Sequence, residues 1–143
     1  MLNNMSFREK STWISFLLLL SISILYGLHF TMVEIGRFSP GSTFHVFLAL
    51  VIAFIVGEIA LHAFIAMQSP RDARTPKDER ERLIDLKATR VAFFALMAGA
   101  ILVIVLSHLP VNRWEIINAV LLSVVVAELT MLGARIVYYR RDI

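Results

Sequence analysis

Four long apolar stretches constrain this chain more than any other feature of its sequence. They run from Trp13 to Val33, Phe44 to Met67, Val91 to Leu109 and Trp114 to Tyr138. A helix needs about 20 residues to cross a hydrocarbon core of ~30 Å. Because lipid cannot satisfy exposed backbone polar groups and four segments cannot close a barrel, we expect the stretches to be transmembrane helices. The predicted fold is an all-α, integral membrane four-helix bundle.

The composition favours a membrane protein over a soluble domain. Hydrophobic residues make up 58% of the chain and charged residues only 17%, whereas soluble domains average roughly 25% charged residues. The chain has no Cys, which excludes disulfides, thiolate metal sites and thiol nucleophiles. The first apolar stretch is longer than the core of a signal peptide, and no small-x-small cleavage site precedes Glu34. We therefore expect it to be a retained span.

The basic residues predict how the chain is oriented in the membrane. All but two of the 14 Lys and Arg residues lie near the N-terminus, in the segment 68–90 or near the C-terminus, and the exceptions are Arg37 and Arg113. The positive-inside rule places the segment 68–90 and both termini in the cytoplasm. The net charge of +3 thus indicates topology. Acidic residues are interspersed among the bases of this segment, which argues against a nucleic-acid partner.

The central segment also contains a helix start. In Thr75-Pro76-Lys77-Asp78, Thr75 can cap a helix, Pro76 suits its first position and Asp78 falls at the third position of a capping box. No helix breaker follows until Gly99. We expect a helix that begins in the cytoplasm and continues into the third span, where Ala95 and Gly99 form a small-xxx-small pair suited to close helix packing.

The two halves of the chain are similar to each other, which indicates an internal repeat. A shift of 70 residues lays Phe44 over Trp114 and Glu58 over Glu128 without a gap. The alternative is that any two apolar helical pairs align tolerably. Repeats over 1–70 and 71–143 predict two parallel copies of a helical hairpin, related by an axis along the membrane normal.

Glu58 and Glu128 are the outstanding polar residues within the predicted spans. An acid at the centre of a membrane helix costs roughly 2.5–3.5 kcal/mol on insertion scales, so each should face protein and find a partner. Under the repeat, the two acids would lie at equal depth and could share a proton. His62 follows Glu58 by one turn, Arg135 follows Glu128 by two turns, and Asn118 lies near the start of the fourth span. A purely structural role, with each acid tying helices together, is the alternative.

Imidazole and carboxylate groups are also expected to gather at the outer end of the bundle. Together they suit Zn²⁺ or another divalent ion, and paired histidines can in principle ligate haem. Their spacing matches no named metal motif, so the expectation is that no cofactor is bound. The candidate ligands are His29, His45, His108, Glu34 and Glu115.

Short motifs along the chain resemble a group of small bacterial four-helix inner-membrane proteins of unknown function. The matching residues are Glu9-Lys10-Ser11-Thr12-Trp13, Tyr26-Gly27, the segment Asp78-Glu79-Arg80-Glu81-Arg82-Leu83-Ile84 before the third span, and Tyr138-Tyr139-Arg140-Arg141. The resemblance implies the same topology and a location in a bacterial inner membrane. Because that group has no established activity, the resemblance implies no functional residue.

No catalytic or nucleotide-binding motif is present, so the chain is not expected to be an enzyme. The leading hypothesis is an accessory or regulatory membrane protein that acts by association with itself or with a larger membrane assembly, using the accessible charged segment Ser69 to Lys87. The first alternative is a proton- or cation-coupled transporter or channel that uses Glu58 and Glu128. The second is a metal-binding protein with its site at the outer face.

Overall fold

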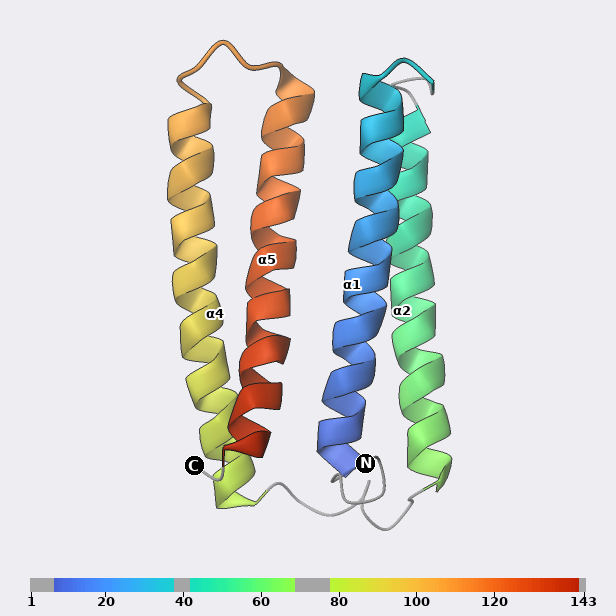
Figure 1. Ribbon diagram of the computed structural model, residues 1–143, viewed down its shortest axis with the longest axis vertical. Helices are drawn as coiled ribbons and strands as arrows, with labels where there is room; N and C mark the ends of the chain where they lie inside the picture. Colours follow the sequence, from blue (N-terminus) through green and yellow to red (C-terminus); the bar gives the residue numbers. More distant parts are fainter. Residues whose placement is uncertain (1–6, 38–41, 69–77, 142–143) are drawn as a thin grey trace. The chain divides into compact units, whose positions relative to one another are not determined.

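The computed structural model describes residues 7–37, 42–68 and 78–141, and their regular structure consists of four long α-helices (Figure 1). All four are long and apolar enough to cross a membrane. The prediction of an all-α chain with four membrane-length helices is therefore confirmed. The helices are α1 (Phe7–Glu34), α2 (Ser42–Gln68), α4 (Glu79–Leu106) and α5 (Arg113–Arg140).

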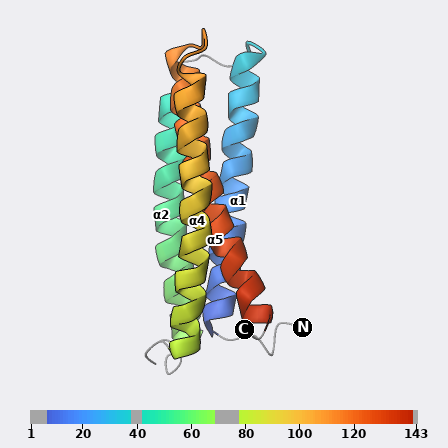
Figure 2. The same ribbon diagram turned by 90° about the vertical axis from the view of Figure 1, so that its left-hand side faces the viewer.

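The chain divides between Thr75 and Pro76 into two compact units. The first contains α1 and α2 and is called here the N-terminal hairpin; the second contains α4 and α5 and is called the C-terminal hairpin. Figures 1 and 2 show that the two helices of each hairpin run antiparallel. When α1 and α2 are shifted by 70 residues along the sequence, α4 and α5 begin and end one or two residues later than the shifted helices. The internal repeat stays a prediction.

The ends of the helices are set by local hydrogen bonds. Asp78 is the N-cap of α4 and forms a complete capping box with Glu81, and Asn112 does the same for α5 with Glu115. The predicted assignment of Asp78 to the third helical position is wrong, because Asp78 followed three residues later by Glu81 caps the helix directly. The other residues of that predicted start, Thr75, Pro76 and Lys77, lie outside the described residues.

The end of α1 is a turn that only glycine adopts easily. Gly36 has a φ of 74°, in the left-handed region. Its N–H donates to the carbonyl of Val33 at 2.9 Å, and the N–H of Arg37 donates to the carbonyl of Met32 at 2.9 Å. This pair of bonds is a Schellman motif, which satisfies carbonyls that the helix leaves free at its end.

Small residues bring the two helices of the C-terminal hairpin close together. A Cβ added at Gly99 would lie only 2.7 Å from the Cβ of Ser123 on α5. Ala88 and Ala92 of α4 and Ala127 of α5 are buried. The predicted close packing at Gly99 is thus observed, and its physical basis is that small side chains let two backbones approach.

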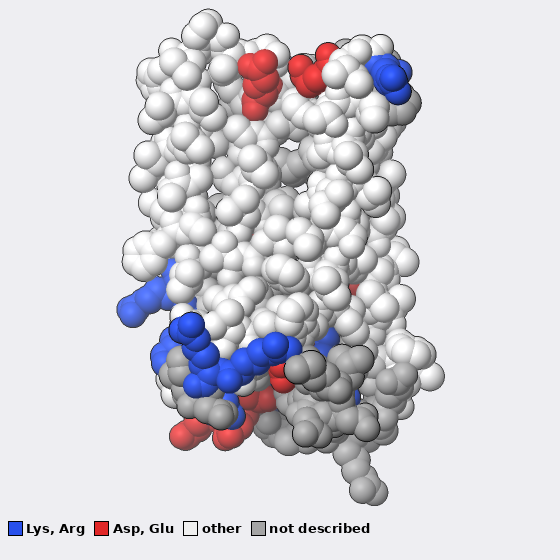
Figure 3. All heavy atoms as spheres, in the orientation of Figure 1, with Lys and Arg blue, Asp and Glu red and all other residues white. Residues whose placement is uncertain are grey.

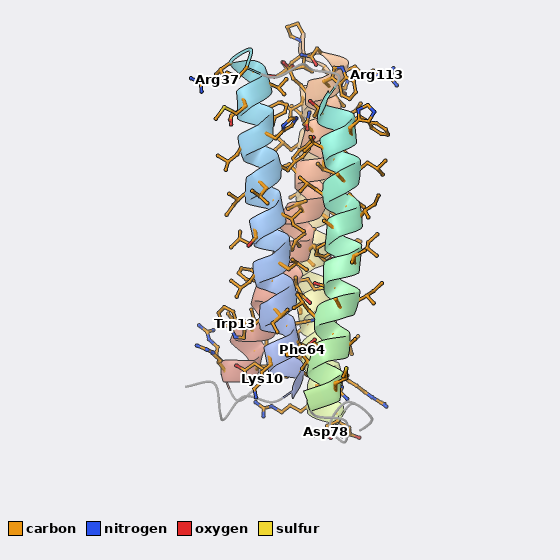
Figure 4. All side chains as sticks on the ribbon, turned by 90° about the vertical axis from the view of Figure 1, so that its right-hand side faces the viewer. Lys10, Trp13, Arg37, Phe64, Asp78 and Arg113 are labelled. Carbon is orange, nitrogen blue, oxygen red and sulfur yellow. The ribbon has the colours of Figure 1, made fainter. Side chains whose placement is uncertain are left out.

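Apolar side chains remain on the outside of both hairpins. At most 11% of the most apolar window of any of the four helices is buried. Figure 3 shows Lys, Arg, Asp and Glu gathered near the helix ends, with a broad surface of other residues between them. In Figure 4, Lys10 and Arg37 mark opposite ends of the N-terminal hairpin, and Asp78 and Arg113 opposite ends of the C-terminal hairpin. This is the surface of a multi-pass membrane protein, whose solvent is the bilayer.

Candidate functional site

Glu58 lies on α2 and is held by a residue of α1. The hydroxyl of Ser15 donates a hydrogen bond to Oε2 of Glu58 at 3.0 Å. The Glu58 side chain is 23% exposed. Its second oxygen, Oε1, is buried and has no hydrogen-bond partner among the residues that the structure describes. One half of the carboxyl group is therefore paired and the other half is not.

His62 connects Glu58 to the end of the N-terminal hairpin. Its Nδ1 lies 2.9 Å from the backbone carbonyl of Glu58 and 3.2 Å from Oε2 of the same residue. A carbonyl oxygen can only accept, so Nδ1 carries a hydrogen. The other ring nitrogen, Nε2, lies 2.8 Å from the hydroxyl of Ser11 on α1. Both ring nitrogens of His62 thus have partners.

These four residues, Ser11, Ser15, Glu58 and His62, are called here the Glu58 cluster. Each helix supplies two of them, four residues apart, so that both lie on one face of that helix. Since α1 and α2 are antiparallel, a step of four residues along α1 matches a step of four residues back along α2. Ser11 therefore meets His62 where Ser15 meets Glu58.

The sequence predicted the proximity of Glu58 and His62 but missed the two serines. A signal was present, because Ser11 and Ser15 are separated by one helical turn and so lie on one face of α1. Their hydroxyls differ from the other serines of α1: Ser21 and Ser23 donate to the carbonyls of Leu17 and Leu19 within their own helix. Which serines bond to α2 and which bond to their own helix depends on how α1 and α2 are aligned in the hairpin.

Glu128 occupies a different environment from Glu58. Glu128 is an exposed residue of α5. Arg135, considered from the sequence as a partner of Glu128, instead places Nε 3.1 Å from Oδ1 of Asp85 on α4. Both side chains of this ion pair are about three-quarters buried. The pair thus links the two helices of the C-terminal hairpin and leaves Glu128 on the surface of α5.

Three further polar side chains of α5 bond to their own helix. Asn118 donates from Nδ2 to the carbonyl of Trp114 at 2.7 Å. Ser123 donates to the carbonyl of Ala119, and Thr130 donates to that of Val126. Such bonds to a carbonyl of the preceding turn satisfy the hydrogen-bonding capacity of a polar side chain without a partner from another helix. They give Asn118 a local role beside any other contact it makes.

The candidate metal ligands are distributed over both hairpins. His29 and Glu34 lie on α1, His45 lies near the start of α2, and His108 follows the end of α4. Nδ1 of His108 lies 2.8 Å from the carbonyl of Ile104. Across residues 7–37, 42–68 and 78–141, no three His, Asp or Glu side chains are grouped so that they could hold a metal ion.

Glu115, the fifth candidate ligand, is occupied by the cap of α5. Its Oε2 accepts from the backbone N–H of Asn112 at 3.0 Å, and its Oε1 accepts from Nδ2 of Asn112 at 2.9 Å. The Asn112 side chain in turn accepts from the backbone N–H of Glu115. Both carboxylate oxygens of Glu115 therefore accept hydrogen bonds from Asn112, the N-cap of α5.

Comparisons with protein families, curated proteins and solved structures found no match to this chain. The Glu58 cluster is consequently interpreted from its own chemistry. A carboxyl group next to an imidazole, with hydroxyl groups on both, can exchange protons over short distances.

Proposed function

We propose that this chain is a multi-pass protein of a bacterial inner membrane that works by association, with a second copy or within a larger membrane assembly, rather than by catalysis. Four membrane-length helices support the location in a bilayer. The excess of Lys and Arg near both termini and in the segment 68–90 supports a cytoplasmic position for these parts.

The exposed position of Glu128 carries this proposal. Glu128 lies well inside α5, between apolar turns, and the C-terminal hairpin does not cover it. A carboxyl group that faces hydrocarbon at this depth costs roughly 2.5–3.5 kcal/mol. A polar group supplied by a partner helix would remove much of that cost. The face of α5 around Glu128 is therefore the proposed association surface within the membrane.

A cytoplasmic surface is proposed to contribute as well. Of the segment Ser69 to Lys87, the part 69–77 lies outside the described residues, and the part 78–87 forms the capped start of α4. This start carries exposed charges of both signs, including Glu79, Arg82 and Lys87. Mixed charges of this kind select a partner by complementarity more than they add affinity.

The transport alternative receives less support from the geometry. From Glu58 toward the end of the N-terminal hairpin that carries Glu34 and His45, the residues are apolar over 46–56 of α2. They are also apolar over 17–25 of α1, apart from Ser21 and Ser23. Both of these serines bond to their own backbone. An ion would find no polar path there. Association also needs no such path, so it is the function that we propose.

Oligomeric state in lipid tests the proposal. The full-length chain, labelled with a fluorophore and reconstituted at low density in vesicles, should give a dimer or larger assembly by single-molecule photobleaching. Glu128→Leu removes the polar group and should reduce the assembled fraction several-fold, whereas Glu128→Gln should preserve most of it. Val126→Leu, an exposed residue on the opposite face of α5, is the matched control.

Two results would contradict the proposal. One is a chain that stays monomeric at every protein-to-lipid ratio and captures no other membrane protein. The other is an assembly that is equally stable with Glu128→Leu and with the wild type. Reversing the charges of residues 78–87 tests the cytoplasmic surface separately, because unchanged partners in a detergent pull-down would exclude it from the interface.

A further inference from the structure

The Glu58 cluster has a property that association does not require: its contacts form a continuous line. From the end of the N-terminal hairpin inward, the line runs from the Ser11 hydroxyl to Nε2 of His62 at 2.8 Å, and from Nδ1 of His62 to Oε2 of Glu58 at 3.2 Å. The Ser15 hydroxyl closes the line at 3.0 Å from the same oxygen. We propose that this cluster is a proton-binding site that loads and unloads from one side of the membrane only.

The Ser11 end of the line lies next to the charged start of α1, where water is expected. Ser11 is near the start of α1, and the His62 side chain is 44% exposed, against 23% for Glu58. Exposure thus decreases along the line from His62 to Glu58. The imidazole is the group through which a proton from the aqueous phase reaches the carboxyl group.

The transfer is balanced in protons. A proton binds Nε2 of neutral His62, where the lone pair accepts the hydrogen bond from Ser11, and gives an imidazolium. The Nδ1–H bond then breaks and an O–H bond forms at Oε2 of Glu58, which becomes a neutral carboxylic acid and donates this O–H to the lone pair left on Nδ1. The ring keeps its new proton on Nε2, and this N–H donates to the Ser11 hydroxyl, so that the direction of that hydrogen bond reverses.

The unpaired oxygen of Glu58 is the reason that this carboxyl group would bind a proton. Oε1 is buried without a hydrogen-bond partner among the described residues, while Oε2 accepts from Ser15. A charged oxygen in that position lacks both water and a donor, which is costly in an apolar surrounding. A bound proton removes the charge, so the cluster has two states that differ by one proton at Glu58.

The line of polar groups ends at Ser15 and Glu58. Beyond them the hairpin is apolar toward its other end, over 46–56 of α2 and over 17–25 of α1, except for the self-bonded Ser21 and Ser23. Within the described residues of α1 and α2, a proton on Glu58 therefore has a polar route only toward Ser11 and His62. The site responds to the pH of a single compartment, which is the property of a sensor and not of a channel.

Few other charged residues lie along α1 and α2. On α1, the charged residues nearest to the Glu58 cluster are Arg8, Glu9 and Lys10, at the same end of the hairpin. The other titratable groups of the described helices α1 and α2 lie toward the opposite end. They are Tyr26, His29, Glu34 and His45.

Infrared difference spectroscopy of the full-length chain in oriented vesicles tests the proposal. A protonated carboxyl group has a C=O stretch that a carboxylate lacks. Acidification on the side of the N-terminus should raise this signal, Glu58→Gln should abolish the change, and Glu128→Gln should keep it. Glu58→Asp should restore a signal at a shifted frequency, which shows that loss in Glu58→Gln is not loss of the fold. His62→Gln should delay the response to a pH jump.

The same vesicles test whether the site is one-sided. Acidification on the opposite side should leave the Glu58 signal unchanged, and proton leakage should be the same in wild type and Glu58→Gln. The proposal is overturned if the signal survives Glu58→Gln, if either side loads Glu58 equally fast, or if proton flux across the bilayer depends on Glu58. None of these results depends on oligomeric state, so this proposal and the proposed association can fail separately.

Discussion

Asp85 on α4 and Arg135 on α5 form an ion pair, with 3.1 Å between Oδ1 and Nε. The pair joins the two helices of the C-terminal hairpin at the end that carries the cap of α4. Arg135 is therefore directed toward Asp85, and Glu128, two turns earlier on the same helix, has a different environment. Removal of one member of a partly buried pair leaves the other charge without its partner, which destabilises the fold.

Removal of one partner should weaken the C-terminal hairpin. Asp85→Asn and Arg135→Gln should each lower the free energy of unfolding, and a double-mutant cycle should give a coupling of about 1 kcal/mol. Unfolding in mixed micelles measures these values. Arg90→Gln, an exposed change on α4, is the control and should have little effect. Strict additivity of the two changes at Asp85 and Arg135 would show that the pair contributes nothing.

The close approach at Gly99 predicts a cost for the smallest possible substitution. In Gly99→Ala the new Cβ would meet the Cβ and Oγ of Ser123 at 2.7 Å, so the helices must separate, at about 1–3 kcal/mol. Gly27→Ala is the matched control, because nothing lies within 4 Å of its Cβ position. Thermal unfolding of the two variants in one detergent compares them directly.

A second substitution should rescue the first. Ser123→Gly removes both atoms that meet the new Cβ at 2.7 Å and leaves the Cα at 3.3 Å, so it should recover part of the stability lost in Gly99→Ala. Ser123→Ala keeps the Cβ and should rescue much less. Equal rescue by both changes would mean that the hydroxyl, rather than the approach of the backbones, causes the cost.

The capping box of α4 predicts which substitutions loosen its first turn. Asp78→Ala removes the oxygen that accepts from the N–H of Glu79 at 2.7 Å and should cost about 1 kcal/mol. Asp78→Asn keeps a good N-cap oxygen and should cost much less. Amide hydrogen exchange over residues 79–82 should therefore accelerate in the first variant only. Equal exchange in both variants and the wild type would contradict the cap.

The serine that holds Glu58 should also stabilise the N-terminal hairpin. Ser15→Ala removes a hydrogen bond between two helices, which in a membrane is worth about 0.5–1 kcal/mol. Ser21→Ala is the control, because the Ser21 hydroxyl bonds to the carbonyl of Leu17 in its own helix at 2.7 Å. The difference between these two variants in the free energy of unfolding isolates the contact with Glu58. No difference would mean that Ser15 contributes no net stability.

Local patterns identified part of the site, and distant contacts supplied the rest. The i,i+4 spacing of Glu58 and His62 is a property of any helix, so their proximity followed from sequence alone. Arg135 lies two turns after Glu128 on nearly the same face of α5, but the structure pairs it with Asp85, a residue 50 positions away whose approach no local spacing reveals. Ser11 and Ser15 were missed for the same reason, since they belong to the site only because α1 and α2 pair in one particular register.

The sequence by itself determined the number of helices, their approximate extents and their apolar surface, because in lipid every backbone polar group must be satisfied within its own helix. The tertiary structure alone decided which face of each helix meets its neighbour. It thereby paired Glu58 with the hydroxyl of Ser15, paired Arg135 with the carboxylate of Asp85 and left Glu128 uncovered by the other helix of the C-terminal hairpin. Hydropathy cannot decide this, since the apolar residues surround each helix on all sides and only side-chain packing selects the contact face.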